Sequence, residues 1–170
     1  MKNNWKKWLV IAVVALACVG IDQVSKIIAI NSLTEFHSVP IINKFFYWTL
    51  CYNTGGAWSI FSNSTWLLVT ISVIALGLII YTLYKSDSKL YDISASVFIG
   101  GLIGNLIDRI TQGKVTDFID FVIFGYDFPV FKVVDTFIVI SAILIAVSMI
   151  LEDKKETKKV EVKEEENGKD

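Results

Sequence analysis

Few side chains in this sequence can act as a nucleophile or hold a metal. The chain has one histidine, His37, and two cysteines, Cys18 and Cys51. A nucleophilic Ser or Cys needs an adjacent base, and a zinc site needs several Cys, His or carboxylate ligands at short spacing. The cysteines have no paired spacing that would indicate a disulfide framework, and no glycine-rich phosphate loop is present. We therefore expect neither a metal nor a cofactor.

Long apolar runs are abundant instead. Of 170 residues, 54% are hydrophobic, and the mean hydropathy of +0.56 is too high for a soluble domain of this size. A membrane-spanning helix needs roughly 20 mostly apolar residues. Four runs meet this requirement, and none alternates polar and apolar residues as a barrel strand does: Trp8–Ile30, Thr65–Tyr84, Tyr91–Ile107 and Val133–Leu151. We predict an all-α membrane protein with four transmembrane helices, forming a single domain over residues 1–151.

The basic residues are unevenly distributed between the connections. Eleven of the 16 lie before the first span, between the second and third spans, or after the fourth. Because positively charged loops stay on the cytoplasmic side, both termini are predicted to be cytoplasmic. The connections 31–64 and 108–132 then face the extracytoplasmic side.

The last segment, residues 152–170, is rich in Lys and Glu and almost free of apolar residues. This composition predicts a charged, disordered cytoplasmic tail.

The first apolar run has a second interpretation. A lysine-rich start followed by an apolar core and Ala15–Cys18 resembles a lipoprotein signal peptide with its cleavage box. The apolar pattern continues to Ile30, however, and leucine lies one place too close to the cysteine. An uncleaved transmembrane span is therefore the preferred interpretation.

The two outward connections contain strand-like segments. Residues 45–52 are rich in aromatic residues and precede a turn at Asn53–Gly56, and "KVTDFIDF" lies in the second connection at Lys114–Phe121. Aromatic side chains suit the head-group region of a bilayer. We expect these segments to form a small extracytoplasmic β-sheet and loop cradle on the outer membrane surface.

Polar residues collect at the outward ends of the predicted spans. Ionisable residues are rare within membranes and tend to face a bundle interior or a cavity, so each one indicates a functional site. Asp22 and Lys26 share one helix face, either as a pair that neutralises itself or as a wall of a site. The complete set is Asp22, Lys26, Asn53, Asn105, Asp108, Arg109, Asp117, Asp120 and Asp135.

Carboxylates are the remaining groups that could carry out chemistry. Two carboxylates held together cannot easily both ionise, so one can take a proton from water while the other protonates a carbonyl. This arrangement can hydrolyse a peptide bond. Asp135, at the front of the fourth span, is one member by its position. The residues alone leave its partner open among Asp108, Asp117, Asp120 and Asp127.

Five blocks resemble the lipoprotein signal peptidases (signal peptidase II), bacterial membrane aspartic endopeptidases: "DQVSK", "YNTGGAWSIF", "GGLIGNLIDR", "VTDFIDF" and "FPVFKVVDT". Their order against four spans makes the resemblance specific, and it covers roughly residues 10–150. It implies that Asp117 and Asp135 activate water and protonate the carbonyl. It also implies supporting roles for seven residues: Asp22, Lys26, Asn53, Gly55, Asn105, Asp108 and Arg109.

The resemblance further implies the substrate and the location. Diacylglyceryl-modified prolipoproteins would be cut before the lipidated cysteine, at the extracytoplasmic face of the bacterial cytoplasmic membrane. No cofactor would take part. Separately from the resemblance, we expect the enzyme to contact membrane lipid, to bind no nucleic acid and to be a monomer.

The sequence departs from the family pattern at two places. Lys132 and Val134 replace the usual Asn and Ala, and Gly55–Trp58 reads "GGAW" where "GAAF" is commoner. Lys132 lies three residues before Asp135. Its ammonium therefore either favours the ionised form of the Asp117–Asp135 dyad or extends to the lipid head groups.

Two other classes of protein are compatible with parts of this sequence. A transporter could use Asp22 and Lys26 as an ion relay, but transporters place their sites near the midplane and show internal repeats, which this chain lacks. A non-enzymatic assembly factor could use the aromatic loop as a docking surface. Loss of activity on replacing an aspartate would separate an enzyme from that second alternative.

Overall fold

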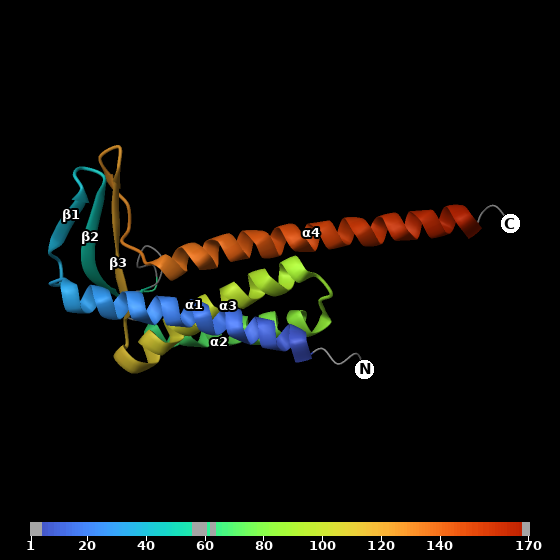
Figure 1. The fold of residues 1–170 in the computed structure, drawn as a ribbon, viewed down its shortest axis with the longest axis horizontal. Helices are drawn as coiled ribbons and strands as arrows, with labels where there is room; N and C mark the ends of the chain where they lie inside the picture. Colours follow the sequence, from blue (N-terminus) through green and yellow to red (C-terminus); the bar gives the residue numbers. More distant parts are fainter. Residues whose placement is uncertain (1–4, 56–60, 62–63, 168–170) are drawn as a thin grey trace.

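The computed structural model describes residues 5–55, 61 and 64–167. The "GGAW" departure lies largely outside the described residues, as do Gly56 of the predicted turn and Trp58 of the aromatic segment. Four helices are long and apolar enough to cross a membrane, as predicted: α1 (Trp5–Ser32), α2 (Thr65–Lys85), α3 (Lys89–Gln112) and α4 (Val133–Asn167). Helices α1, α2 and α4 all contact α3, and in Figure 1 the start of α1 and the end of α4 lie away from the sheet.

Helix α3 is the central helix of the bundle. In the most apolar 18-residue stretch of each helix, 56% is buried for α3, against 22% or less for the other three. Its inner faces carry small residues, and at Gly100 an added Cβ would lie 2.5 Å from the Cβ of Cys18 and 2.7 Å from the Ala15 carbonyl oxygen in α1. Such residues let helix backbones approach closely in a membrane.

The helix ends are set by local signals in two places. Ser88 accepts a hydrogen bond from the Tyr91 backbone N–H and so caps the start of α3. Gly113 ends the same helix with a φ of 73°, a left-handed conformation that glycine adopts without steric cost. This turn directs the chain into the second outward connection.

Four strands form one antiparallel sheet in the order β1 (Ser38–Ile42), β2 (Phe46–Asn53), β3 (Val115–Ile123) and β4 (Tyr126–Asp127). Strands β2 and β3 are the two segments whose sequence predicted strands. The sheet lies across one end of the helix bundle (Figure 1). The predicted combination of four spanning helices and a small sheet is confirmed.

The C-terminal segment differs from the prediction. Helix α4 continues past the last apolar residues to Asn167, where a disordered tail was expected from residue 152. Glu and Lys are strong helix formers, and the segment 152–167 contains neither Gly nor Pro. A composition that is too polar to form a core therefore still permits helix to propagate from the apolar part of α4.

Candidate active site

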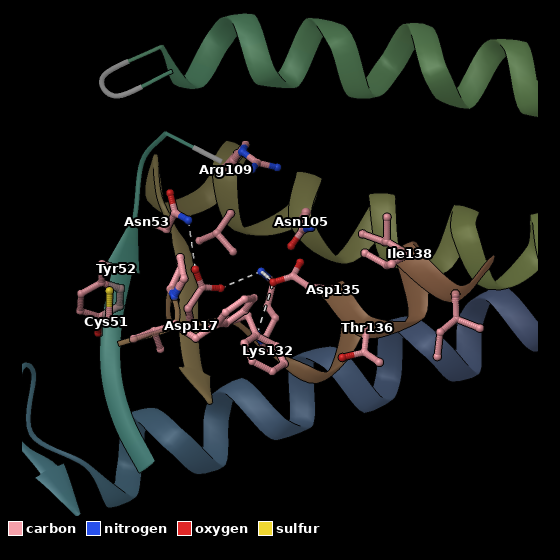
Figure 2. A pocket seen from close by; sticks show the side chains of 17 residues that line it. Cys51, Tyr52, Asn53, Asn105, Arg109, Asp117, Lys132, Asp135, Thr136 and Ile138 are labelled. Atoms are coloured by element: carbon pink, nitrogen blue, oxygen red, sulfur yellow. Dashed lines mark hydrogen bonds and ion pairs between the residues drawn. The ribbon is translucent and has the colours of Figure 1, made fainter. Parts of the chain in front are cut away.

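A cavity of about 720 Å³ lies where the sheet meets the ends of α3 and α4. Its walls come from four elements and one connection, as Figure 2 shows. Apolar walls are formed by the segment before α4 and by the first turns of that helix, including Phe128, Val130, Ile138 and Val139. The charged and amide side chains that line it are Asn53, Asn105, Arg109, Asp117, Lys132 and Asp135.

Asp117 is the third residue of β3. It lies opposite Cys51 in the antiparallel pair with β2, and Asn53 follows two residues later on the same face of that strand. The Asp117 side chain is 2% exposed. Burial raises its pKa, and the charge of Asp135 adds to this effect, while the Lys132 ammonium acts in the opposite direction.

Asp135 lies in the first turn of α4. Its Oδ2 accepts a hydrogen bond from the backbone N–H of Lys132 at 3.3 Å. This is one half of a capping box, in which the third helical residue reaches back to the residue before the helix. The positive end of the helix dipole also favours a negative charge here. Asp135 is 32% exposed at its side chain, so water can reach it.

Lys132 joins the two carboxylates. Its Nζ lies 2.7 Å from Oδ1 of Asp117 and 2.8 Å from Oδ2 of Asp135, and only 4% of its side chain is exposed. The dashed lines in Figure 2 mark this bridge. Burial disfavours the charged form of Lys132, but the negative charges of Asp117 and Asp135 outweigh this effect and raise the pKa of Lys132. Of the two positions that the sequence allowed, the ammonium takes the one beside Asp117 and Asp135.

Asn53 and Gly55 form the other side of Asp117. The Gly55 backbone N–H donates to Asn53 Oδ1 at 2.9 Å, which orients the amide so that Nδ2 donates to Asp117 Oδ2 at 3.2 Å. Gly55 therefore acts through its backbone, and Asn53 contacts the carboxylate directly.

Asn105 and Arg109 line the cavity from α3. They are four residues apart, so they share the helix face that points toward the site. The Oδ1 atom of Asn105 is buried and has no hydrogen-bond partner among the described residues. Leaving an acceptor unpaired is costly, so this atom suits a donor from a bound molecule.

Asp22, Lys26 and Asp108 form a separate cluster that does not line the cavity. Lys26 Nζ lies 2.5 Å from Oδ2 of Asp22 and 2.8 Å from Oδ2 of Asp108, and all three side chains are at most 3% exposed. Gln23 donates to both carboxylates, and Asp108 accepts the backbone N–H of Thr116. The cluster thus attaches the start of β3 to α1 and α3.

The remaining candidate partners of Asp135 lie elsewhere. Asp120 accepts a hydrogen bond from Thr49, and Asp127 is exposed in β4. Asp108 pairs with Lys26. Only Asp117 is connected to Asp135, through Lys132.

Several residues of the site were not found from the sequence. Gln23 lies inside the "DQVSK" block, and its position beside Asp22 was the available signal. Thr136, Cys51 and Tyr52 line the cavity, but an uncharged side chain in an apolar segment carries no signal of its own. Within the described residues, no group of three or more His, Cys, Asp or Glu could hold a metal. The absence of a metal or cofactor from the reaction stays a prediction.

The arrangement brings two carboxylates and an ammonium to one wall of a cavity at the end of a transmembrane bundle. Such a site can accept and donate protons next to a bound amide. Fold and site together define a multi-pass membrane protein with two carboxylates and an ammonium on a cavity at the junction of helices and sheet.

Comparisons with known proteins specify the family. The family model described as Signal peptidase (SPase) II matches residues 14–151. A lipoprotein signal peptidase of Listeria monocytogenes serotype 4a (strain HCC23) is 36% identical over 144 residues, covering 84% of this chain and 94% of the relative.

Two solved structures have the same fold, and both are described as a bacterial membrane enzyme structure determined by the in meso method. The one at 2.3 Å resolution has a TM-score of 0.77 and 32% identity, with 86% of this chain and 90% of that chain covered. The one at 1.9 Å resolution has a TM-score of 0.72 and 34% identity, with 82% and 92% covered. The chain belongs to the signal peptidase II family, a family of membrane proteases. This membership argues against the transporter and the assembly factor.

Proposed function

We propose that this protein is an aspartic endopeptidase that removes signal peptides from diacylglyceryl-modified prolipoproteins, cutting before the lipidated cysteine. The observation that carries the proposal is the pair Asp117 and Asp135, joined by one ammonium on the wall of the cavity. Membership of the signal peptidase II family supplies the substrate class.

The carboxylates handle the protons of hydrolysis. Asp135 is the more exposed of the two and meets water, so it acts as the base. Asp135 takes a proton from water, and the resulting hydroxide attacks the scissile carbonyl carbon. The carbonyl oxygen then takes a proton from the cluster of Asp117, Lys132 and Asp135. A preorganised site of this kind needs no covalent intermediate.

The cavity walls suit a lipidated peptide. The apolar side chains at the start of α4, such as Ile138 and Val139, offer a surface for acyl chains. Asn105, with its unpaired Oδ1, can accept a peptide N–H. A substrate held both by lipid and by backbone contacts places its scissile bond beside Asp135.

The proposal is tested by cleavage of a synthetic precursor with purified protein in detergent. We expect a diacylglyceryl-modified precursor to be cut immediately before the modified cysteine, as read by mass spectrometry. The same peptide without lipid should be cut at least about tenfold more slowly, because remote binding energy supports turnover. Equal cleavage of both peptides would contradict the lipid specificity, and no cleavage of either would contradict the proposed activity.

The location is also part of the proposal. We place both termini in the cytoplasm and the sheet on the extracytoplasmic side of the bacterial cytoplasmic membrane, because the lysines predict this orientation. Phe124 is fully exposed between β3 and β4, and Asp87 is exposed between α2 and α3.

Cysteines introduced at these two positions test the orientation. An impermeant thiol reagent should label Phe124→Cys in intact cells, whereas Asp87→Cys should be labelled only after lysis. The unsubstituted protein measures any reaction of Cys18 and Cys51. The opposite labelling pattern would place the cavity on the cytoplasmic side.

A further inference from the structure

The hydrogen bonds around Asp117 leave little room for a carboxylic proton. Oδ1 accepts from Lys132 Nζ, and Oδ2 accepts from Asn53 Nδ2. A protonated carboxyl must donate from one of its oxygens, but both of these oxygens face N–H donors. The contacts therefore suit an ionised Asp117, although burial raises its pKa.

Asp135 is also arranged as an acceptor. Its Oδ2 accepts from both the backbone N–H and the Nζ of Lys132. Among the described residues nothing donates to its Oδ1, and the side chain is partly exposed. This oxygen is the one free to take a proton from water.

The proton that two clustered carboxylates would ordinarily share thus resides on Lys132. An ammonium has three N–H bonds, and the carboxylates take two of them. Lys132 also lines the cavity, and among the described residues no acceptor takes the third N–H bond, so this bond is left for a substrate.

We propose that the Lys132 ammonium donates to the scissile carbonyl oxygen, and that the enzyme works with Asp117 and Asp135 both ionised. The inference rests on the proposed function and names the acid of that reaction. Asp135 remains the base, and Asp117 becomes a positioning residue that holds the ammonium.

The protons balance over one turnover. Asp135 takes a proton from water, the hydroxide oxygen bonds to the carbonyl carbon, and the carbonyl oxygen takes a proton from Lys132. When the C–N bond breaks, its electron pair goes to nitrogen, which takes the proton held by Asp135. One hydroxyl proton of the intermediate returns to the Lys132 amine, so the carboxylic acid, the new amine and the starting enzyme are formed.

Other charged groups near Lys132 do not supply this proton. Arg109 in α3 acts electrostatically on Asp117 and Asp135, but a guanidinium cannot be deprotonated in a protein. Asp22 in α1 is within electrostatic range of Lys132, but Lys26 neutralises it. Asn53 in β2 is uncharged. Lys132 is therefore the proton donor in direct contact with the dyad.

The position of Lys132 in the chain supports a chemical role. It directly precedes α4, at the N-cap position, where Asn, Asp, Ser and Thr are favoured because their oxygens accept backbone N–H groups. A lysine cannot make that bond. The helix start thus lacks a side-chain acceptor from its N-cap residue and has a cation between two carboxylates at that position instead.

The test is the pH dependence of kcat/KM from about pH 4 to about pH 10, which spans the carboxyl and lysine ranges. We expect wild-type activity to persist through weakly alkaline pH, because the acid is an ammonium. A wild-type rate that falls already below about pH 8 would overturn the proposal, since the acid would then be a carboxyl. This measurement needs no variant.

Lys132→Asn sharpens the test. Without the ammonium, the dyad must share one proton to supply an acid, so the alkaline limb should move at least about one pH unit lower. If Lys132 is only a charge beside an acidic aspartate, its removal raises the carboxyl pKa values, and the alkaline limb moves higher. A limb that stays in place or moves higher would overturn the proposal.

Lys44→Asn is the matched control. Lys44 is exposed in the turn between β1 and β2 at a φ of 63°, where asparagine is well tolerated, and it does not line the cavity. Its pH profile should match the wild type. Failure of this inference is distinct from failure of the proposed function, which would appear as cleavage that survives Asp135→Asn.

Discussion

Two Asp–Lys–Asp clusters of nearly identical local geometry lie at the same end of this molecule. In one, Lys26 bridges Asp22 and Asp108 at 2.5 and 2.8 Å, and in the other Lys132 bridges Asp117 and Asp135 at 2.7 and 2.8 Å. Both lysines are almost fully buried. Distance and charge therefore do not distinguish them.

Solvent access is the difference between the two clusters. Every side chain of the Lys26 cluster is at most 3% exposed, whereas Asp135 in the Lys132 cluster is 32% exposed and lines the cavity. A buried charge without solvent access cannot exchange protons with water, whereas the same arrangement with one open carboxylate can. We therefore infer that exposure separates a structural cluster around Lys26 from a chemical one around Lys132.

The largest expected effect comes from removing either carboxylate of the open cluster. Asp135→Asn should lower kcat by about 10²-fold or more, because a positioned base contributes about 10²–10⁴-fold. Asp117→Asn should cause a loss of similar size, because it removes the carboxylate that holds the Lys132 ammonium in place. The measurement is cleavage of the lipidated precursor by purified variants of wild-type elution volume. Asp120→Asn is the control, since Asp120 is also in β3 but binds Thr49. Near-normal turnover by either dyad variant would contradict the proposed mechanism.

The second comparison is between the two lysines. Lys26→Met leaves two carboxylates buried without a cation, a change that typically costs about 3–5 kcal/mol. Lys132→Met should cost less stability, because water reaches Asp135 and the dyad can take up a proton. Thermal unfolding in detergent should therefore show the larger drop in midpoint for Lys26→Met. Equal drops would mean that exposure does not separate the clusters.

A smaller effect is expected from the helix contact that closes the Lys26 cluster. A Cβ added at Gly104 of α3 would clash with Oδ2 of Asp22, whereas nothing lies within 4 Å of the corresponding position at Gly77 or Gly20. Gly104→Ala should cost about 1–3 kcal/mol, as overpacking does. Gly77→Ala is the matched control and should be neutral or slightly stabilising, because alanine favours helix. The unfolding midpoints of the two variants give the comparison, and a Gly104→Ala protein as stable as the wild type would show that α1 can shift freely.

The transmembrane helices and the two main strands were predictable from the sequence because their signals are local. Apolar length defines a span, and β-branched and aromatic residues before a turn favour a strand. Strand β1 and the helical continuation of α4 were not predicted, since the first depends on pairing with β2 and the second on propagation from an existing helix. The set of polar residues was predictable as well, because an ionisable residue near a membrane span is conspicuous on its own.

The division of that set into two clusters was decided only by the tertiary structure. From the residues alone Asp108, Asp117, Asp120 and Asp127 were equivalent partners for Asp135, and the choice of Asp117 came from the family resemblance. The pairing of β3 with β2, together with the position of the start of α4, places Asp117 beside Lys132. Close packing of α1 on α3 places Asp108 beside Lys26. The sequence determines which side chains carry charge, since this is a property of single residues. Which charges meet, and which of them water can reach, depends on contacts between distant segments, such as that between Gln23 and Asp108, 85 residues apart. Only the packed structure brings such segments together.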